Sequence, residues 1–473
     1  MIADLIARHW EMLDALLAAI GLVVYVVASH SLHQRRHPSA AIAWVMAILL
    51  VPYVALPLYL AFGSRKIVPT YPASGRAKIC RITASSCTTA ARAQQLAEAM
   101  ALPDPVAYQD LAIHADGAAS LNALRRLING AQRTLEVSTF LFGRDVLGRE
   151  IAGLLCQRSL EGVRVRLLID GVGFYMGGTL DLDAFRDAGV QVQRFVSPFR
   201  SPRRGRTNLR NHRKMLIADG ERLWCGGRNI SAEYFEGDAT ALIPRVPWID
   251  LSFDLSGELA ELARQQFEQD WAIAREKALP AQTGATGCSA PAQPSSLLAQ
   301  LVASGPDRAD DTIHTLLISA CFTSQRRILA VTPYFVPDPV LLAAMTLAAR
   351  RGVEVDLILP ARSNHRLADF ARHRALRELA SAGARVWLHP AMVHAKAVVV
   401  DDELALAGSA NLDGRSLFIN YEMMVAFYDA VAVGGFAEWV TAHQRETTLY
   451  EAQSPGVMRE LAEGLLLWLA FQL

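Results

Sequence analysis

The feature that most constrains the fold of this chain is a sequence pattern that occurs twice. Both copies have the form H-x-K-x4-D-x6-G-[GS]-x-N, with identical spacing throughout. In chain order, the fixed side chains are His212, Lys214, Asp219 and Asn229, followed by His394, Lys396, Asp401 and Asn411. A single His-x-Lys carries no information, but a repeat of the whole string indicates two related halves with the same local structure.

Strand and helix patterns recur in the same order around the two copies. In the first half, strands are predicted over 134–142, 162–170 and 189–192, with helices over 148–161 and 182–188. In the second half, strands are predicted over 327–334, 352–359 and 383–387, with helices over 339–351 and 367–382. Strands alternating with helices predict an α/β fold with mostly parallel sheets covered by helices. We therefore expect two α/β/α sandwich halves related by a pseudo-twofold axis.

The N-terminal region has the composition of a membrane segment. Residues 40–62 form a run of 23 residues without a charge, which is long enough to span a bilayer core of about 30 Å. Pro52 and Pro57 would kink such a helix. The shorter apolar run 15–28 is predicted to be its partner, with 30–39 as the turn of a two-helix transmembrane hairpin. A re-entrant or interfacial hairpin remains an alternative.

The pattern of the chain also predicts its division into segments. Residues 1–64 are expected to form the membrane hairpin, 65–109 a connector, and 110–276 the first half. A linker loop is predicted over 277–296, where Pro, Gly, Ser and Ala dominate. The second half then covers 297–473 and ends in an apolar helix over 458–473.

The composition of the chain limits the classes of molecule that it is expected to bind. The chain has 473 residues, with 47 Lys and Arg against 46 Asp and Glu, so its net charge is near +1. This balance argues against a general nucleic-acid binder. A hydrophobic fraction of 52% favours a membrane protein. Basic residues after Phe62 place the catalytic part on the cytoplasmic side by the positive-inside rule.

The repeated residues suit chemistry on a phosphodiester. Residues two apart on a strand point to the same face, so each His projects beside its Lys. Two such groups on an otherwise apolar strand are costly unless an anion belongs there. Combined in one cavity, two Lys and two Asn would stabilise the transition state. One His would attack phosphorus while the other acts as general acid and then base.

Acidic residues have separate predicted roles. Asp250 and Glu422 are available to orient the imidazole rings. Asp219 and Asp401 fall where a turn should start, and the sequence leaves open whether they form the turn or take part in catalysis. A metal site is the competing interpretation of these His and Asp residues. It is disfavoured because a Lys two residues after each His would repel a cation, and no ligand spacing occurs.

At these residues the chain resembles the phospholipase D superfamily, whose signature is H-x-K-x4-D. It is most similar to bacterial cardiolipin synthases in the stretches NLRNHRKMLIADG and MVHAKAVVVDDELALAGSANLDGRS. The resemblance implies transfer of a phosphatidyl group from one phosphatidylglycerol to another, with release of glycerol, through a covalent phosphohistidine and without a cofactor or metal. It implies a multi-pass protein of the bacterial inner membrane. The implied catalytic residues are His212, Lys214, Asp219, His394, Lys396 and Asp401.

One departure from the family pattern is Gly227, where a hydroxyl residue is common and where the second half has Ser409. Basic residues also surround only the first motif: Arg200, Arg203, Arg204, Arg206, Arg210 and Arg213. They form either a solvated loop or a contact with anionic phospholipid. The predicted substrate-contact residues are Asn229, Asn411, Asp250, Glu422, Arg210 and Arg213.

Three alternatives to this function remain. A hydrolase of the same superfamily would use water, and another phosphatidyltransferase would use a different alcohol acceptor. A non-catalytic lipid-binding protein would not need both histidines. The sequence is compatible with a homo-oligomer.

Overall fold

The computed structural model describes residues 2–31, 38–63, 88–178, 180–196, 208–239, 241, 244–275, 297–456, 458–460 and 463–464. Several predicted features lie outside the described residues. These are the hairpin turn from residue 32 to 37, most of the 65–109 connector, the linker 277–296, most of the C-terminal helix 458–473, and Arg200, Arg203, Arg204 and Arg206.

The N-terminal region consists of three helices: α1 (Ile2–Ser31), α2 (Pro38–Leu50) and α3 (Pro52–Phe62). The predicted single segment over 40–62 is wrong, because the helix breaks at Val51, which has φ −144°. A residue before proline disfavours helical geometry, whereas Pro52 itself fits the first turn of the next helix. Among the described residues, no helix combines the length and apolar character needed to cross a membrane.

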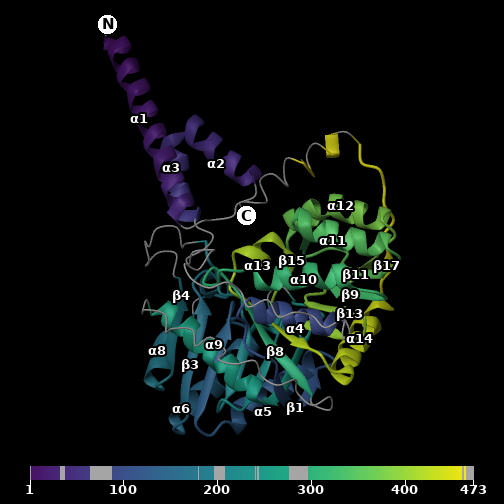
Figure 1. The fold of residues 1–473 in the computed structure, drawn as a ribbon. Helices are drawn as coiled ribbons and strands as arrows, with labels where there is room; N and C mark the ends of the chain where they lie inside the picture. The colour runs from purple at the N-terminus through teal and green to yellow at the C-terminus, as the bar shows by residue number, and fades with distance from the viewer. Residues whose placement is uncertain are drawn as a thin grey trace.

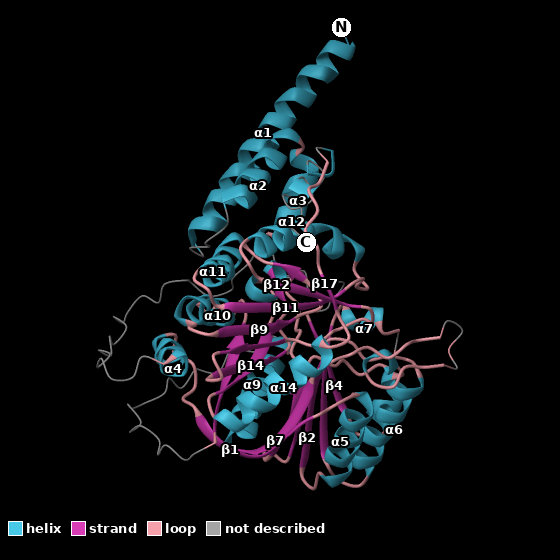
Figure 2. Cartoon of the chain, turned by 90° about the vertical axis from the view of Figure 1, so that its right-hand side faces the viewer, coloured by secondary structure: helices cyan, strands magenta, loops and turns pink. Residues whose placement is uncertain are grey.

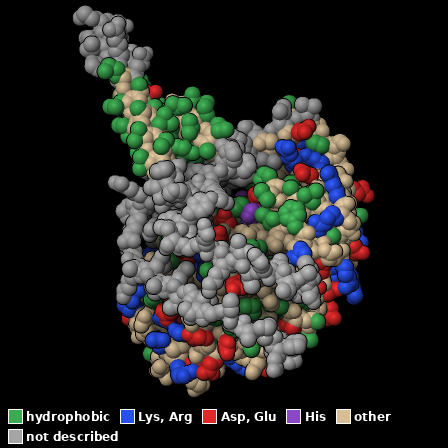
Figure 3. Space-filling model, in the orientation of Figure 1, with side chains coloured by type: hydrophobic (Ala, Val, Ile, Leu, Met, Phe, Trp, Pro, Cys, Tyr) green, Lys and Arg blue, Asp and Glu red, His purple; other side chains and the backbone are tan. Residues whose placement is uncertain are grey.

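The three helices pack together and project from the rest of the molecule (Figure 1). The Tyr59 ring of α3 lies 5.4 Å from Tyr25 of α1 and 5.2 Å from Trp44 of α2, measured between ring centroids. Gly21 allows close approach of α1 and α2, since a Cβ there would lie 2.7 Å from Ile48. Their outer surface is largely apolar (Figure 3).

The body of the protein is built on one sheet of fifteen strands, divided into two matching halves. The first half contains β1 (Val106–Ile113), β2 (Thr134–Thr139), β3 (Arg164–Asp170), β4 (Gln191–Phe195), β5 (Met215–Ala218), β6 (Arg222–Gly226) and β7 (Ser252–Gly257). The second contains β8 (Leu298–Ser304), β9 (Arg327–Val331), β11 (Glu354–Pro360), β12 (Arg385–His389), β13 (Ala397–Val400), β14 (Leu404–Gly408), β16 (Glu422–Phe427) and β17 (Thr448–Leu449). The short strands β10 (Phe335–Val336) and β15 (Leu412–Asp413) pair separately.

The strand order confirms the repeat. Outward from the centre, the first half runs β1-β7-β6-β5-β2-β3-β4, and the second runs β8-β16-β14-β13-β9-β11-β12 before β17. Strands β1 and β8 pair antiparallel and join the halves. The expectation of mostly parallel sheets is wrong. Among the described strands of the fifteen-stranded sheet, only the outer ones, β2-β3-β4 and β9-β11-β12, pair in parallel. The inner strands are antiparallel because short turns such as 219–221 connect β5 to β6 directly.

Helices cover both faces of each half (Figure 2). The first half carries α5 (Gly117–Gly130), α6 (Val146–Leu160), α7 (Gly173–Met176), α8 (Leu182–Asp187) and α9 (Glu258–Ala274). The second half carries α10 (Thr312–Thr323), α11 (Pro339–Arg350), α12 (Arg366–Ser381), α13 (Gly414–Phe418) and α14 (Ala430–Gln444). Within the predicted connector, α4 (Thr89–Ala99) packs against the second half, where Thr89 donates a hydrogen bond to Asp401.

Three apolar cores separate these layers. Helices α5, α6 and α8 cover the outer face of the first half, and α4, α10, α11 and α12 cover that of the second. The third core lies between the halves and contains residues of α9, α14 and strands of both halves. Phe427 of the second half contacts Tyr108 and Phe253 of the first half, with ring centroids 5.5 and 5.4 Å apart. The two halves therefore share one core.

We predict that Phe427→Ala destabilises both halves together. A buried Phe→Ala change costs about 3–5 kcal/mol, and Phe427 is fully buried in the shared core. Urea unfolding followed by circular dichroism should show one transition at lower urea. The control Val431→Ala, at a residue 80% exposed, should leave the midpoint unchanged. Two separate transitions would contradict the shared core.

Candidate active site

The two motif histidines lie where segments of opposite halves meet. His212 and Lys214 directly precede β5, and His394 and Lys396 directly precede β13. The backbone N–H of His212 donates to the carbonyl of Tyr421 at 2.9 Å, and that of His394 donates to the carbonyl of Ile249 at 2.6 Å. Each histidine segment is thus joined by a parallel bridge to the other half.

These bridges place each acidic residue beside the histidine of the opposite half. Glu422, which follows Tyr421, lies 3.1 Å from Nδ1 of His212. Asp250, which follows Ile249, lies 2.7 Å from Nδ1 of His394. The sequence suggested both acids as ring-orienting groups but did not indicate this crossed arrangement. Both carboxylates contact imidazoles, and their contact with substrate stays a prediction.

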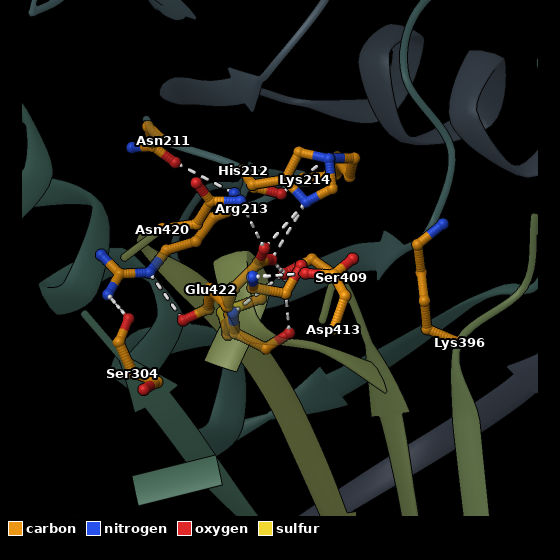
Figure 4. A network of polar contacts seen from close by, with 12 residues as sticks. Asn211, His212, Arg213, Lys214, Ser304, Lys396, Ser409, Asp413, Asn420 and Glu422 are labelled. Carbon is orange, nitrogen blue, oxygen red and sulfur yellow. Dashed lines mark hydrogen bonds and ion pairs between the residues drawn. The ribbon is translucent and has the colours of Figure 1, made fainter. Parts of the chain in front are cut away.

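The two acidic residues are held differently. Figure 4 shows Glu422 below His212, close to Ser409 and Asn420. The Ser409 hydroxyl donates to Glu422 at 2.5 Å, and the Asn420 amide donates at 3.2 Å. Gly227 occupies the position matching Ser409, and a Cβ there would lie 2.2 Å from Asp250 Oδ1. Asp250 therefore fills the space that a side chain at position 227 would need.

Burial controls the charge of these groups. Burial lowers the pKa of both histidines, to about 3 for His394. It also lowers the pKa of Lys214 to about 7 and that of Lys396 to about 8. Each lysine further lowers the pKa of the histidine in the other half, so the four groups form one electrostatic centre. Burial alone raises the pKa of Glu422, but His212 and Lys214 outweigh it and the net shift is downward.

The surroundings of the two histidines also differ. The His212 side chain is 14% exposed and contacts the Phe140 ring edge-on at 5.3 Å. The His394 side chain is 5% exposed and contacts the rings of Tyr234 and Trp248, both from the first half. Nζ of Lys396 lies 2.7 Å from Nδ1 and 3.1 Å from Nε2 of His394. Within the described residues, the ring of His212 is hydrogen-bonded only through Nδ1.

The motif asparagines are both buried near the centre. Asn229 accepts hydrogen bonds through Oδ1 from the backbone N–H of Leu141 at 3.3 Å and the hydroxyl of Thr139 at 3.5 Å. Asn411 Oδ1 is buried and accepts no hydrogen bond from any described residue. The second half therefore retains an unused acceptor in the site.

Asp219 and Asp401 have structural positions rather than catalytic ones. Each carboxylate accepts hydrogen bonds from three successive backbone N–H groups: Gln132, Arg133 and Thr134 for Asp219, and Gln325, Arg326 and Arg327 for Asp401. Both residues have positive φ, 58° and 55°, as the turn requires. The four residues of β5 put Asp219 about 15 Å from Lys214 at the usual rise of a strand. The two carboxylates therefore fix the start of β2 and of β9, which favours the turn interpretation over the catalytic one.

Arg210 and Arg213 also differ from the prediction. Arg213 is fully buried, forms an ion pair with Asp270, and donates to the carbonyls of Glu422 and Ser304. The buried Arg210 donates to the carbonyl of Val196 at 3.0 Å and lies 3.5 Å from Asp170. Both side chains thus support the His212 segment from within the protein. Headgroup contact is excluded for Arg213, because its guanidinium is enclosed.

Other residues near the histidines were missed by sequence reasoning. Tyr234, Trp248, Arg228 and Asp270 belong to this group, and no spacing in a single sequence distinguishes them from ordinary core residues. Within the described ranges, no group of three His, Cys, Asp or Glu side chains is arranged to hold a metal ion.

Comparison with known protein families agrees with this geometry. Residues 124–271 and 317–443 match the family described as "Cardiolipin synthase, PLD-like domain", and together these ranges cover more than half of the chain. The chain belongs to this family. Residues 17–64 match a second family, "Phospholipase_D-nuclease N-terminal".

Individual relatives support the family membership. Cardiolipin synthase A of Pseudomonas entomophila is 31% identical over 431 residues, covering 88% of each chain. The Pseudomonas putida protein of that name is 31% identical over 469 residues, covering 94% of this chain and 95% of the relative. The crystal structure of a phosphatidylserine synthase from Haemophilus influenzae superposes with a TM-score of 0.61 at 15% identity, over 81% of this chain and 100% of the other. This last likeness shows the fold.

We predict that Asp219→Ala and Asp401→Ala lower stability without abolishing turnover. Each change leaves three backbone N–H groups without their acceptor, which costs about 1–3 kcal/mol. The change in urea midpoint measures this loss, and activity per folded molecule should stay within about tenfold of wild type. If either variant kept wild-type stability but lost turnover, that result would support a catalytic role for the replaced aspartate.

We also predict that kcat/KM for a phosphodiester substrate falls as the pH rises from about 7 to about 8, because the buried lysines lose their protons there. Their pKa values lie below the ordinary value of 10.5, so the charged form is present below this window and lost above it. A bound phosphate should raise both pKa values, so the fall in kcat should occur at higher pH. A flat kcat/KM profile between about pH 6 and about pH 10 would contradict this role.

Proposed function

We propose that this protein is a cardiolipin synthase that transfers a phosphatidyl group from one phosphatidylglycerol to the glycerol hydroxyl of another. The observation that carries the proposal is the composite centre, in which each histidine is paired with a carboxylate from the other half. Two buried lysines beside these pairs suit an anionic phosphodiester. Family membership and relatives named cardiolipin synthase A support the choice of substrate.

In the proposed first step, His212 is the nucleophile. The carboxylate of Glu422 accepts a hydrogen bond from Nδ1–H of His212. Nε2 is then the unprotonated ring nitrogen, and its lone pair points toward phosphorus. As the Nε2–P bond forms, the bond from phosphorus to the glycerol oxygen breaks. A bound phosphodiester anion raises the low pKa of His394, so that the ring takes up a proton from solvent. This imidazolium gives its proton to that oxygen, so neutral glycerol leaves. The greater exposure of His212 supports this assignment.

In the proposed second step, the same groups work in reverse. The neutral His394 takes the proton from the glycerol hydroxyl of a second phosphatidylglycerol. The resulting oxygen attacks phosphorus, and the P–N bond to His212 breaks to give cardiolipin. Lys214 and Lys396 balance the negative charge on the phosphoryl oxygens in both steps. Asn411 has an unused acceptor that suits a glycerol hydroxyl.

We further propose that the N-terminal helices attach the enzyme to the bacterial inner membrane, with the catalytic part in the cytoplasm. Large apolar side chains of α1, α2 and α3 are exposed, and the most exposed include Met12, Val23, Val26, Ile42 and Leu50. Such a surface is costly in water and favourable in lipid. The basic residues that follow Phe62 support the cytoplasmic side.

The decisive experiment is product analysis by mass spectrometry. Purified full-length protein with phosphatidylglycerol in detergent micelles should produce cardiolipin and glycerol in equal amounts. Formation of phosphatidic acid instead would favour the hydrolase, and a product with an added alcohol would favour another acceptor. No product of any kind would contradict a catalytic function.

We predict that His212→Asn and His394→Asn both reduce cardiolipin formation by at least about 10²–10⁴-fold, the usual contribution of a positioned general acid or base. A substrate with a nitrophenol leaving group separates their roles, since it departs without a proton. His394→Asn should still release nitrophenol and accumulate phosphorylated His212, whereas His212→Asn should do neither. The reverse pattern would exchange the two assignments.

A further inference from the structure

A buried polar chain in the first half has no counterpart in the second half. Arg228 is 1% exposed, and its guanidinium donates to the carbonyl of Tyr234 at 2.8 Å and to the hydroxyl of Ser252 at 3.0 Å. The Ser252 hydroxyl lies 3.2 Å from Nδ1 of His114. Nε2 of His114 lies 2.6 Å from Asp254, whose side chain is 25% exposed. We call Arg228, Ser252, His114 and Asp254 the Arg228 chain.

In the second half, other residues occupy the positions that match the Arg228 chain. Gly226 of β6 pairs with Ser252, and Gly408 of β14 pairs with Met424, so Met424 matches Ser252. Ala410 matches Arg228 by its place in the repeated motif. The backbone N–H of His114 donates to the carbonyl of Ser252, whereas Val302 pairs with Met424, so Val302 matches His114.

The matching residues of the second half form an ordinary apolar core. Ala410, Met424 and Val302 are all buried in one cluster under α10 and α11. This fold can therefore fill these positions with apolar side chains. Burying a guanidinium and an imidazole in their place costs free energy. Stability alone does not explain why the first half carries the Arg228 chain.

The position of the Arg228 chain indicates which groups of the site it affects. Arg228 follows Gly227, where a Cβ would lie 2.2 Å from Asp250 Oδ1, and it helps lower the pKa of the Asp250 carboxyl, after the larger effects of His394 and Lys396. Its hydrogen bond to Tyr234 also holds a residue whose ring contacts His394 at 5.0 Å. Glu422, by contrast, is held by the neutral donors Ser409 and Asn420. A guanidinium lies near each pair, but Arg213 donates to the backbone carbonyl of Glu422, whereas Arg228 acts on the carboxyl of Asp250.

We infer that Arg228 is a positioning residue that specialises the first half, making the imidazolium of His394 a stronger acid than it would be beside an uncompensated Asp250. This inference rests on the proposed function. The nearby cation partly neutralises Asp250, so the carboxylate stabilises protonated His394 less. The charged or titratable groups around this pair are Arg228, Lys396, Lys214, Tyr234 and Tyr334.

The test copies the apolar residues of the second half into the first, in the triple variant His114→Val, Arg228→Ala, Ser252→Met. The variant should fold, since the same side chains pack at the matching positions of the second half. Loss of the cation should raise the pKa of His394 and of Lys396, both of which must be protonated for glycerol to leave. The alkaline limb of the kcat profile for cardiolipin formation should therefore move up by about one pH unit or more.

Two controls separate this effect from a structural defect. The acidic limb, set by His212, should stay in place, and Arg228→Lys should restore most of the wild-type alkaline limb because it keeps the charge. A variant that melts cooperatively with both limbs unchanged would overturn the inference. If the triple variant does not melt cooperatively, Arg228→Met and Arg228→Lys are compared in the same way. Absence of cardiolipin formation by wild type would instead contradict the proposed function.

Discussion

The active centre depends on two short backbone bridges between the halves. Each places a histidine segment against a carboxylate segment that belongs to the other half. As a result, the two motif histidines, His212 and His394, each have their carboxylate partner in the opposite half. The shared core around Phe427 and the pairing of β1 with β8 hold the bridges in register. Duplication of the fold thus produces one composite centre, and the proposed mechanism uses residues of both halves.

The same arrangement lets two equivalent positions differ in chemistry. Ser409 donates a hydrogen bond to Glu422. The matching residue, Gly227, has no side chain, so Asp250 lies against its backbone. Both lysines donate to the carbonyl of the histidine two residues before them. Nζ of Lys396 also lies 2.7 Å from Nδ1 of the His394 ring. Two-step phosphoryl transfer needs one neutral and one protonated histidine at the start. Burial lowers the pKa of both histidines, so the charge of a bound phosphodiester is what favours protonation of His394.

Much of this architecture was predictable from sequence, because the motif repeats and strand–helix order recurs. The strands β2, β3, β9 and β11 lie within the predicted ranges or one residue beyond them. The crossed carboxylates were not predictable, since a bridge between residues such as Asn211 and Tyr421 leaves no local pattern. The roles of Asp219 and Arg213 were hard to predict for a similar reason. A charged side chain near a motif has the same sequence signature whether it contacts substrate or supports a turn. Proline at position 52 indicated a kink, but the chain instead starts a new helix there.

The crossed pairing is tested most directly by rapid-quench measurement of phosphohistidine formation with a nitrophenyl phosphodiester. In Glu422→Gln, formation of phosphorylated His212 should slow by on the order of 10²-fold, because the nucleophile loses the carboxylate that orients it. In Asp250→Asn, formation should remain near the wild-type rate, since this leaving group needs no general acid. A strong loss in Asp250→Asn with a normal rate in Glu422→Gln would contradict the account.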